Sequence, residues 1–329
     1  MQVLGMQQRS EASLELLTGD VVKSWAIEGE ELNADEVRSS IARHLGMDQA
    51  GLPPVGRAIE GVVEMMLDAT GRFDRELTPE RLFDWHTRLF PKDQRRLERV
   101  RVGGWRLPES DPMQVISGRA GHQRVHFEAP AAARIEEEMQ NFLRWFNGSQ
   151  QGDPVLLAGI AHLWFLTVHP FEDGNGRIAR AIGDMALARA DGTKERYYSL
   201  STQIESERKD YYLRLEQTQR GDLDATEWLL WFLGILDRAI ESAEHILGKV
   251  FHKALIWQRA AEHSLNERQR KVLGRLLDDF KGHLTSSKYA KLSACSTDTA
   301  LRDIRQLLSY GLLIQNQAGG RSTSYRLAD

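Results

Sequence analysis

The chain of 329 residues lacks most of the features that mark secreted and membrane proteins. It has a single cysteine, Cys295, so no disulfide can form within the chain, and a reducing, cytoplasmic setting is expected. The longest apolar run, residues 155–168, is too short to cross a bilayer and contains His162. The first residues, MQVLGMQQRSEASLELL, have neither the basic start nor the long apolar core of a signal peptide. These absences predict a cytoplasmic protein with no membrane partner.

Three widespread binding motifs are also missing. The chain contains no G-x-x-x-x-G-K-[ST] phosphate loop and no H-E-x-x-H zinc motif. A calcium loop, D-x-[DN]-x-[DN]-G, fails when begun at Asp173, because Arg177 takes a ligand position and Ile178 takes the glycine position. The P-loop enzymes, the zinc proteases of that motif and the EF-hand proteins are therefore excluded.

The composition is that of an ordinary globular protein, but the charge is uneven. Hydrophobic residues make up 41% and charged residues 27% of the chain, and the length suggests two or three domains. The net charge is −4, yet residues 266–329 hold 11 Lys and Arg against 6 Asp and Glu, a net of +5 against −9 for the remainder. A basic end behind an acidic body indicates a C-terminal module with an anionic partner. The alternative is the ordinary scatter of charge among small domains.

Helical periodicity dominates the sequence, so the fold class is predicted to be mainly α. Residues 11–27 predict a helix, a turn and a second helix, which ends at Glu28 and Gly29. Asn33 or Asp35 can cap the next helix, which is expected to stop at Gly46. Further helices are predicted over 59–67 and over 79–89, the latter capped by Thr78.

Residues 101–130 differ, because they are rich in Gly and Pro and contain two β-type runs, MQVIS and RVHF, around GRAG. This pattern predicts a β-hairpin. Residues 131–261 are again expected to be almost entirely helical, with a core helix over 223–236. The predicted domains are an N-terminal helical region (1–54), a core (55–262) and a C-terminal module (263–329).

The C-terminal module has the pattern of a winged helix-turn-helix. Helices are predicted over 271–280, 286–292 and 297–308, and a small hairpin follows with its turn at Gly319 and Gly320. The third helix would present Thr299, Arg302 and Arg305, and the hairpin would carry Arg321 and Arg326. Such a helix fits a DNA major groove, although winged helices also serve as adapters and dimerisation modules. DNA and a second copy of the chain both stay open as partners.

The stretch HPFEDGNGRIAR, residues 169–180, is the densest polar cluster in the chain. Because proline disfavours helix at the residue before it, one helix is expected to end near His169 and Pro170. Ile178, Ile182 and Met185 recur at helical spacing, so a second helix is expected to begin near residue 175 or 176. The polar residues therefore occupy a tight turn between two buried helices.

That turn has the chemistry of a phosphate site. A helix start offers free N–H groups and the positive end of the helix dipole, and Gly174 and Gly176 let a phosphate approach the backbone. Arg177 and Arg180 can each bind phosphate oxygens through two N–H groups. Asp173 is a hard oxygen ligand suited to Mg²⁺, and Asn175 can donate to a phosphate oxygen. His169 is the candidate general base, and Phe171 is expected to anchor the turn in the core.

The same twelve residues match the Fic motif H-P-F-x-[D/E]-G-N-G-R-x-x-R at every specified position, and residues 55–240 resemble a Fic core. The resemblance implies transfer of AMP from ATP to a hydroxyl side chain of a protein, which could be another copy of the chain. It implies that His169 deprotonates the hydroxyl and that Asp173 holds Mg²⁺. The implied nucleotide-binding residues of this motif are Phe171, Glu172, Asp173, Gly174, Asn175, Gly176, Arg177 and Arg180.

Two further segments resemble parts of Fic proteins. The hairpin resembles the flap that docks the target peptide by adding a strand, with Arg124, Val125, His126 and Phe127 as its residues. The stretch RKDYYLRLEQTQRGD resembles the region that closes the nucleotide pocket, with Tyr211, Tyr212 and Gln219 near the base or ribose. A purely structural hairpin and core aromatic residues are the respective alternatives.

The segment VVKSWAIEGEEL resembles the inhibitory motif [S/T]-x-x-x-E-[G/N] of autoinhibited Fic proteins, with Ser24 and Glu28 at the specified positions. A Glu28 carboxylate on Arg180 would exclude the γ-phosphate of ATP from that guanidinium. The alternative is an ordinary surface Glu at a helix end. In some family members the same Glu serves the reverse reaction, removal of AMP, and the sequence does not separate these directions.

Other functions fit parts of the pattern. One is a DNA-binding regulator in which the Fic site acts as a nucleotide sensor, and another is transfer of a different nucleotide such as UMP. The expected cofactor is Mg²⁺ with ATP as substrate. The target protein, the oligomeric state and the signal that releases Glu28 are not legible in the sequence.

Overall fold

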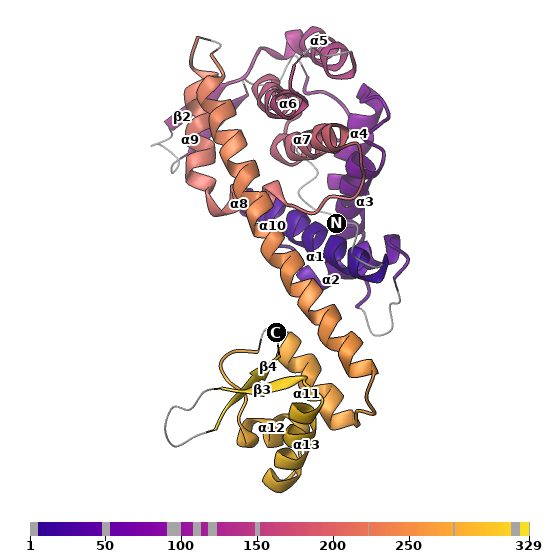
Figure 1. Ribbon diagram of the computed structural model, residues 1–329. Helices are drawn as coiled ribbons and strands as arrows, with labels where there is room; N and C mark the ends of the chain where they lie inside the picture. The colour runs from indigo at the N-terminus through magenta and orange to yellow at the C-terminus, as the bar shows by residue number, and fades with distance from the viewer. Residues whose placement is uncertain are drawn as a thin grey trace. The chain divides into compact units, whose positions relative to one another are not determined.

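The structure is a computed structural model that describes residues 6–47, 53–90, 100–107, 113–117, 124–148, 152–222, 224–278, 280–316 and 323–328. The chain forms two compact units (Figure 1), one of residues 9–244 and one that consists mainly of residues 245–329. Each unit has its own buried hydrophobic cluster. The units are described separately below.

Helices dominate the first unit, as predicted. They are α1 (Met6–Ile27), α2 (Ala34–His44), α3 (Arg57–Gly71), α4 (Pro79–Leu89), α5 (Ile135–Asn147), α6 (Pro154–Val168), α7 (Asn175–Asp191), α8 (Leu200–Ser206), α9 (Arg208–Gln219) and the first part of α10 (Thr226–Ala261), with a short 3₁₀ turn η2 (Ala132–Arg134). The strands β1 (Gln114–Ser117) and β2 (Arg124–Glu128) form the predicted hairpin.

The helix starts follow the capping residues that the sequence offers. The side chain of Asn33 accepts hydrogen bonds from the first turn of α2, Thr78 does so for α4, and Asp153 does so for α6. The predicted ends also hold, since α1 stops before Glu28 and Gly29 takes a φ of 81°. These local signals set the boundaries because each one satisfies backbone groups that the helix leaves open.

The prediction of a turn within residues 11–27 is wrong, because α1 is a single helix. Thr18, Gly19 and Asp20 have turn-like composition, but their contacts favour the helix. The Thr18 hydroxyl donates to the Leu14 carbonyl at 2.6 Å, and the buried Asp20 carboxylate accepts from the Ser199 hydroxyl, also at 2.6 Å. Tertiary contacts therefore override the weak local preference for a turn.

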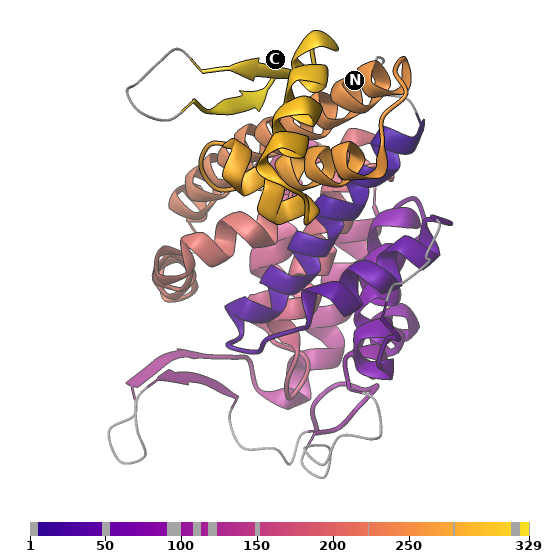
Figure 2. The ribbon, with the colours of Figure 1, turned by 90° about the horizontal axis from the view of Figure 1, so that it is seen from below.

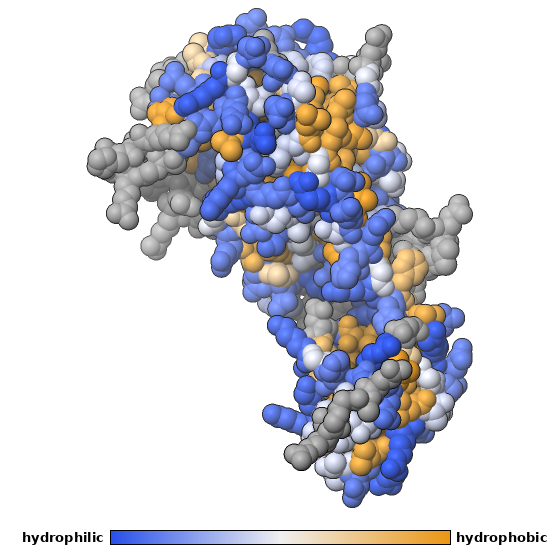
Figure 3. Space-filling model, turned by 60° about the vertical axis from the view of Figure 1, so that its left-hand side comes forward, coloured by the Kyte–Doolittle hydropathy of each residue, from blue (hydrophilic) through white to orange (hydrophobic). Residues whose placement is uncertain are grey.

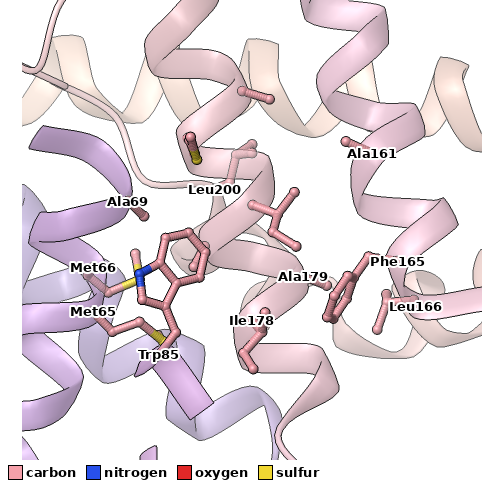
Figure 4. Packing of buried hydrophobic residues seen from close by; sticks show 14 of the residues in the cluster. Met65, Met66, Ala69, Trp85, Ala161, Phe165, Leu166, Ile178, Ala179 and Leu200 are labelled. Carbon is pink, nitrogen blue, oxygen red and sulfur yellow. The ribbon is translucent and has the colours of Figure 1, made fainter. Parts of the chain in front are cut away.

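The core of the first unit lies around α6 and α7, which are side by side near its centre (Figure 1). Figure 4 shows Phe165 of α6 close to Ala179 of α7, while Met65, Met66 and Trp85 approach from α3 and α4. Residues of α1 and α2 belong to the same cluster. The N-terminal helices are therefore packed into the core that carries the 169–180 motif. The two compact units divide at 244/245, within α10, and the domain boundaries at 54/55 and 262/263 stay predictions.

Helices α3 and α4 are joined by a polar anchor beside this core. Asp68 of α3 accepts hydrogen bonds from the indole of Trp85 and from Nε of Arg81, both at 2.8 Å. Trp85 is fully buried, so its N–H would lose a partner if Asp68 were absent.

A glycine sets how closely these two helices approach. A Cβ added at Gly61 of α3 would lie 2.5 Å from the backbone carbonyl oxygen of Arg88, at the end of α4. We expect Gly61→Ala to lower the free energy of unfolding by about 1–3 kcal/mol, because the helices must separate. Gly71→Ala in the same helix is the matched control, since its Cβ meets no described atom within 4 Å. Urea titrations of both variants check the prediction, and equal stability would contradict it.

The hairpin is antiparallel, with a bulge in β2 at His126, because Val115 pairs with Phe127 while Ile116 pairs with Val125. It extends from one side of the helical bundle (Figure 2), and its strand β2 contacts α9. The Arg220 guanidinium donates to the Val125 carbonyl, and His126 Nδ1 lies 2.5 Å from Glu216 Oε2. The hairpin is therefore held by the side chains of Glu216 in α9 and of Arg220, which directly follows α9.

The second unit has the elements that the sequence predicts. They are the end of α10, α11 (Glu267–Leu277), α12 (Ser286–Ser293), α13 (Thr297–Ser309), β3 (Leu313–Gln315) and β4 (Tyr325–Leu327). The strands pair antiparallel, and Gly311 ends α13 with a φ of 67°. The predicted turn at Gly319 and Gly320 and the wing residue Arg321 lie outside the described residues. The winged-helix assignment stays a prediction.

No helix within the described part of the chain is long and apolar enough to cross a bilayer. Large hydrophobic side chains do reach the surface at some positions, among them Leu213 of α9 and Leu230 of α10. Figure 3 shows hydrophilic residues (blue) alternating with smaller hydrophobic areas (orange) on the face in view.

Candidate functional site

The motif forms the connection between α6 and α7. His169 follows the last residue of α6 and adopts a left-handed conformation (φ 51°), which turns the chain sharply before Pro170. Such a conformation costs a non-glycine residue about 1–2 kcal/mol. The buried Arg106 supports it, since Arg106 Nε donates to the His169 carbonyl and the Arg106 N–H donates to the Pro170 carbonyl, both at 2.9 Å. Arg106, which lies outside the motif, therefore stabilises the strained turn through the carbonyls of His169 and Pro170.

Phe171 anchors the turn in the core, as predicted. Its ring is fully buried, stacks on His86 with 4.2 Å between ring centroids, and also contacts Trp105 and Phe83. This aromatic cluster leaves the polar residues that follow Phe171 little freedom to move.

Asn175 closes the turn onto itself. Its side-chain oxygen accepts from the Phe171 N–H at 3.0 Å and its amide nitrogen donates to the Phe171 carbonyl at 2.8 Å. The sequence predicts that this amide donates to a phosphate oxygen. In the structure the amide is instead engaged with the backbone of the turn, and Asn175 is 2% exposed.

Asp173 and Glu172 face outward from the turn. The Asp173 side chain is 55% exposed, accepts from the Gly174 N–H at 2.6 Å and lies 3.5 Å from Arg177 Nη2. Glu172 accepts from the Arg101 N–H at 2.8 Å, which ties the turn to the segment before the hairpin. Asp173 thus keeps an accessible carboxylate next to an arginine, whereas Glu172 serves a backbone contact.

At the start of α7, Gly174 and Gly176 lie so close to neighbouring atoms that a Cβ at either position would be crowded. Gly174 has a φ of 79°, and a Cβ there would lie 3.1 Å from the Phe90 ring. A Cβ at Gly176 would lie 2.2 Å from Glu28 Oε1 and 3.2 Å from Arg180 Nη1. The space that the sequence predicts for a phosphate is therefore occupied, at Gly176, by a carboxylate of the N-terminal segment.

Arg180 is buried and bound by α1. Its Nε donates to the Ser24 hydroxyl, and its Nη2 donates to the Ser24 carbonyl and to Glu28 Oε1, each at 2.8 Å. Ser24 and Glu28 are one helical turn apart, so both reach the same guanidinium. The structure thus places Ser24 and Glu28, from the segment that resembles the inhibitory motif, on Arg180 of the 169–180 motif.

Arg177 is buried between two aromatic rings. Its guanidinium carbon lies 5.0 Å from the ring centre of Trp25 and 5.2 Å from that of Phe90, and its Nη1 lies 3.3 Å from Glu30 Oε2. Among the described residues, Arg177 Nε and Arg180 Nη1 are buried donors without a hydrogen-bond partner. Each arginine therefore has one donor that an anion at the start of α7 could use.

Burial lowers the pKa of His169 to about 4, so its imidazole is neutral near pH 7. His169 Nδ1 lies 3.3 Å from the Leu166 carbonyl. If Nδ1 carries the proton and donates there, Nε2 is left as the acceptor, which is the form that a general base requires. Besides burial and the Leu166 contact, the charges of Arg106, Glu28 and Asp173 act on this pKa, which places His169 in the same site.

The pKa of Glu28 lies below its usual value. Partial burial acts to raise it, and the positive charges of Arg180, Arg177 and Arg208 outweigh that effect. Glu28 is therefore ionised at neutral pH and holds a full negative charge against Arg180.

The predicted base-pocket residues lie on α9, close to the same site. Tyr211 is 1% exposed, its hydroxyl lies 3.0 Å from His162 Nε2, and burial raises its pKa. The Tyr212 hydroxyl donates to the Ile27 carbonyl at 3.2 Å, and Gln219 Nε2 lies 3.4 Å from the Thr167 hydroxyl. Tyr211 therefore has the surroundings of a core residue, which is the alternative that the sequence left open.

The flap residues fall on β2. Val125 is 38% exposed, Phe127 is half-buried, and His126 sits in the bulge facing Glu216. The backbone of Arg124 pairs with Ser117. The position of the Arg124 side chain lies outside the described structure.

Sequence reasoning missed His86, Arg106 and Glu30. His86 accepts from the Gly103 N–H at 3.0 Å, so its Nε2 carries the proton that faces the Asp173 carbonyl at 3.2 Å, and burial lowers its pKa to about 4. His86 and Arg106 lie on segments far from the motif, with no spacing that links them to it. Glu30 could have been found from the sequence, because it is a second acidic residue two positions after Glu28.

Comparison with known proteins agrees with this geometry. Residues 76–187 match the Fic/DOC family, and residues 1–47 match a domain of unknown function, DUF4172. The protein adenylyltransferases fic-1 of Caenorhabditis briggsae and Caenorhabditis elegans are each 27% identical to the chain, over 202 and 204 residues that make up 60% of it. The chain spans 36% of the length of these relatives. The protein adenylyltransferase Fic of Drosophila mojavensis is 34% identical over 87 residues, which are 26% of this chain and 16% of that protein.

Solved structures share the fold. A Fic family protein from Desulfovibrio desulfuricans G20 superposes with a TM-score of 0.55 at 22% identity, covering 99% of this chain and 89% of that one. A Fic domain-containing signaling protein from Bacteroides thetaiotaomicron has a TM-score of 0.52 at 20% identity, with 76% and 90% covered. Residues 76–187 therefore match the Fic/DOC family, and the chain shares the fold of solved Fic structures. The chain is a distant relative of the Fic protein adenylyltransferases.

Proposed function

We propose that the chain transfers AMP from ATP to a Ser, Thr or Tyr hydroxyl of a protein, and that Glu28 restrains this activity. One observation supports the proposal most. Around the first turn of α7 lie a neutral imidazole (His169), an accessible carboxylate (Asp173) and two buried guanidinium groups that each retain an unpartnered donor. These are the groups that phosphoryl chemistry requires, namely a base, a metal ligand and cations for the phosphates.

The phosphates of ATP fit the arginine pair. Arg177 and Arg180 lie one helical turn apart at a helix start, and each has one buried donor without a hydrogen-bond partner. Glycine at 176 leaves room that any side chain would fill. In the proposal, Arg177 and Arg180 hold the β- and γ-phosphates, and the N–H groups of the turn face the α-phosphate. Asn175 keeps the turn in shape through its two bonds to Phe171.

The donor set also fits Mg²⁺. Asp173 offers a hard oxygen ligand that is more than half exposed, which suits an ion that retains most of its water. When bound, Mg²⁺ would neutralise phosphate charge. The distance between Asp173 Oδ1 and Arg177 Nη2 is long at 3.5 Å, so this ion pair leaves the Asp173 carboxylate able to bind a metal ion.

His169 would accept the proton of the target hydroxyl while the hydroxyl oxygen attacks the α-phosphorus of ATP and pyrophosphate leaves. The turn holds the imidazole by backbone contacts to Arg106, which keeps it in place without using its Nε2. The hairpin, whose strand β2 contacts α9, is proposed to position the target backbone. In the reverse direction, the same site could remove AMP with Glu28 engaged.

A panel of nucleotides tests the proposal. The Glu28→Gly variant is incubated with Mg²⁺ and, separately, with ATP, UTP, GTP and CTP, with and without a cell extract, and is analysed by intact mass spectrometry. We expect a mass gain of one AMP with ATP, through modification of the chain itself when no target is present. A gain with another nucleotide would change the donor, and the absence of transfer to the chain and to any extract protein with all four would refute the proposal.

The second unit supports an additional candidate function, DNA binding. Arg302 and Arg305 are exposed on α13, while Asp303 between them is buried and pairs with Arg268 at 2.9 Å, which fixes the face that the helix presents. Two outward arginines on a fixed helix favour a nucleic acid backbone or groove. A mobility shift that weakens steeply with salt and is lost in Arg302→Ala/Arg305→Ala would support DNA binding. Specific DNA binding without any nucleotide transfer would favour a regulator with a nucleotide sensor.

A further inference from the structure

Glu30 lies against the second arginine of the site. Its Oε2 is 3.3 Å from Arg177 Nη1, while Glu28 Oε1 is 2.8 Å from Arg180 Nη2. One segment of three residues, Glu28-Gly29-Glu30, thus provides one carboxylate to each of the two arginines. The arginines are three positions apart on α7, and the carboxylates are two positions apart on the segment.

The turn at Gly29 makes this arrangement possible. In a helix, side chains two positions apart point in different directions. Here α1 ends at Ile27, Gly29 takes a φ of 81°, and the Glu30 N–H donates back to the Trp25 carbonyl at 3.2 Å. A glycine adopts this conformation without steric cost, and the reversal lets both acids face α7.

The helix before this segment also covers Arg177. Trp25 of α1 lies over the guanidinium of Arg177, Phe90 lies near it as well, and the side chain of Arg177 is 5% exposed. The N-terminal region therefore covers both arginines and not Arg180 alone. Glu30 therefore competes with a phosphate for Nη1 of Arg177.

We infer that Glu28-Gly29-Glu30 is an internal mimic of a diphosphate and that Glu30 is a second inhibitory residue. The inference rests on the proposed function, which assigns the two arginines to the β- and γ-phosphates. It gives residues 1–47, the match to the domain of unknown function, a role in masking both phosphate positions. A ligand with two linked phosphates then competes with both carboxylates, whereas a ligand with one phosphate need not.

Calorimetric binding measurements on the full chain test this inference. In the Glu28→Gly background, Glu30→Gln is expected to tighten binding of ATP and of inorganic pyrophosphate about two- to fivefold, the range for a partly exposed ion pair, and to leave AMP binding unchanged. Glu31→Gln is the matched control, because it removes the same charge from the next residue, which is exposed. It should change none of the three affinities.

Two outcomes would overturn the inference. Unchanged pyrophosphate and ATP affinity in the Glu30 variant would show that Glu30 does not compete with a phosphate for Arg177. Equal tightening by the Glu31 variant, or equal tightening of AMP, would show a general effect of charge. Since the readout is binding, it is separate from the proposed function: a Glu28→Gly protein that transfers nothing refutes AMP transfer, while its pyrophosphate affinity still decides the role of Glu30.

Discussion

Replacing Glu28 with glycine is expected to raise the rate of AMP transfer about 10- to 100-fold, the worth of one hydrogen bond between charged groups. The Glu28 carboxylate holds Arg180 Nη2 at 2.8 Å and fills the space over Gly176. Removing it frees the guanidinium and the room beside it for the γ-phosphate. The rate is measured with labelled ATP and read as AMP attached to protein.

Two controls isolate the cause. Glu28→Gln keeps the shape of the side chain but removes its charge, so we expect an intermediate rate. Glu31→Gly changes a neighbouring exposed acid and should leave the rate at the level of the unmodified chain. A Glu28→Gly protein that binds ATP no better and transfers no faster than the unmodified chain would contradict the role of Glu28.

The restraint should not respond to mild acidification. The pKa of Glu28 is held below its usual value by Arg180, Arg177 and Arg208 despite partial burial. A carboxylate with a depressed pKa keeps its ion pair at all pH values above its ordinary titration range and loses it only as the pH falls through the lowered value. Transfer by the unmodified chain is therefore expected to stay low from pH 5.5 to pH 8, about where cells operate. We therefore expect the proposed restraint to respond to a signal other than pH.

The sequence predicted the parts of the site that depend on neighbours along the chain. The capping residues Asn33 and Thr78, the end of α1 before Glu28 and Gly29, and the turn of residues 169–174 are all local, and the structure confirms them. The pairing of Glu28 with Arg180 joins residues far apart in sequence, and it was accessible only through the resemblance to autoinhibited Fic proteins.

The remainder depends on tertiary contacts that no spacing encodes. Arg106 is separated from His169 by the hairpin, and only the fold brings its guanidinium to the His169 carbonyl. The prediction of a turn within residues 11–27 failed for the same reason, because the hydrogen-bond partner of Asp20 is Ser199, which lies far away in the sequence. Asn175 also bonds the backbone of its own turn, a contact that the sequence does not predict, and its donation to a phosphate stays a prediction.

Replacing His169 with alanine in the Glu28→Gly background is expected to lower the rate of AMP transfer about 10²- to 10⁴-fold, the usual contribution of a general base. ATP binding should persist, because Arg177, Arg180 and the turn do not depend on the imidazole for their contacts. Retained ATP affinity by calorimetry serves as the control for folding. A transfer rate within about tenfold of the parent would mean that another group removes the proton.

The pH dependence of the parent gives an independent check on the same residue. Burial lowers the pKa of His169 to about 4, so the base is already neutral at pH 5.5 and the rate should be nearly level from there to pH 8. An imidazole with an ordinary pKa of about 6.5 would instead lose half of the activity near that pH. A steep decline between pH 7 and pH 6 at saturating ATP would therefore show that His169 is exposed to water in the active state. In that case the lowered pKa would belong to the restrained form alone, and release of α1 would also change the proton affinity of the base.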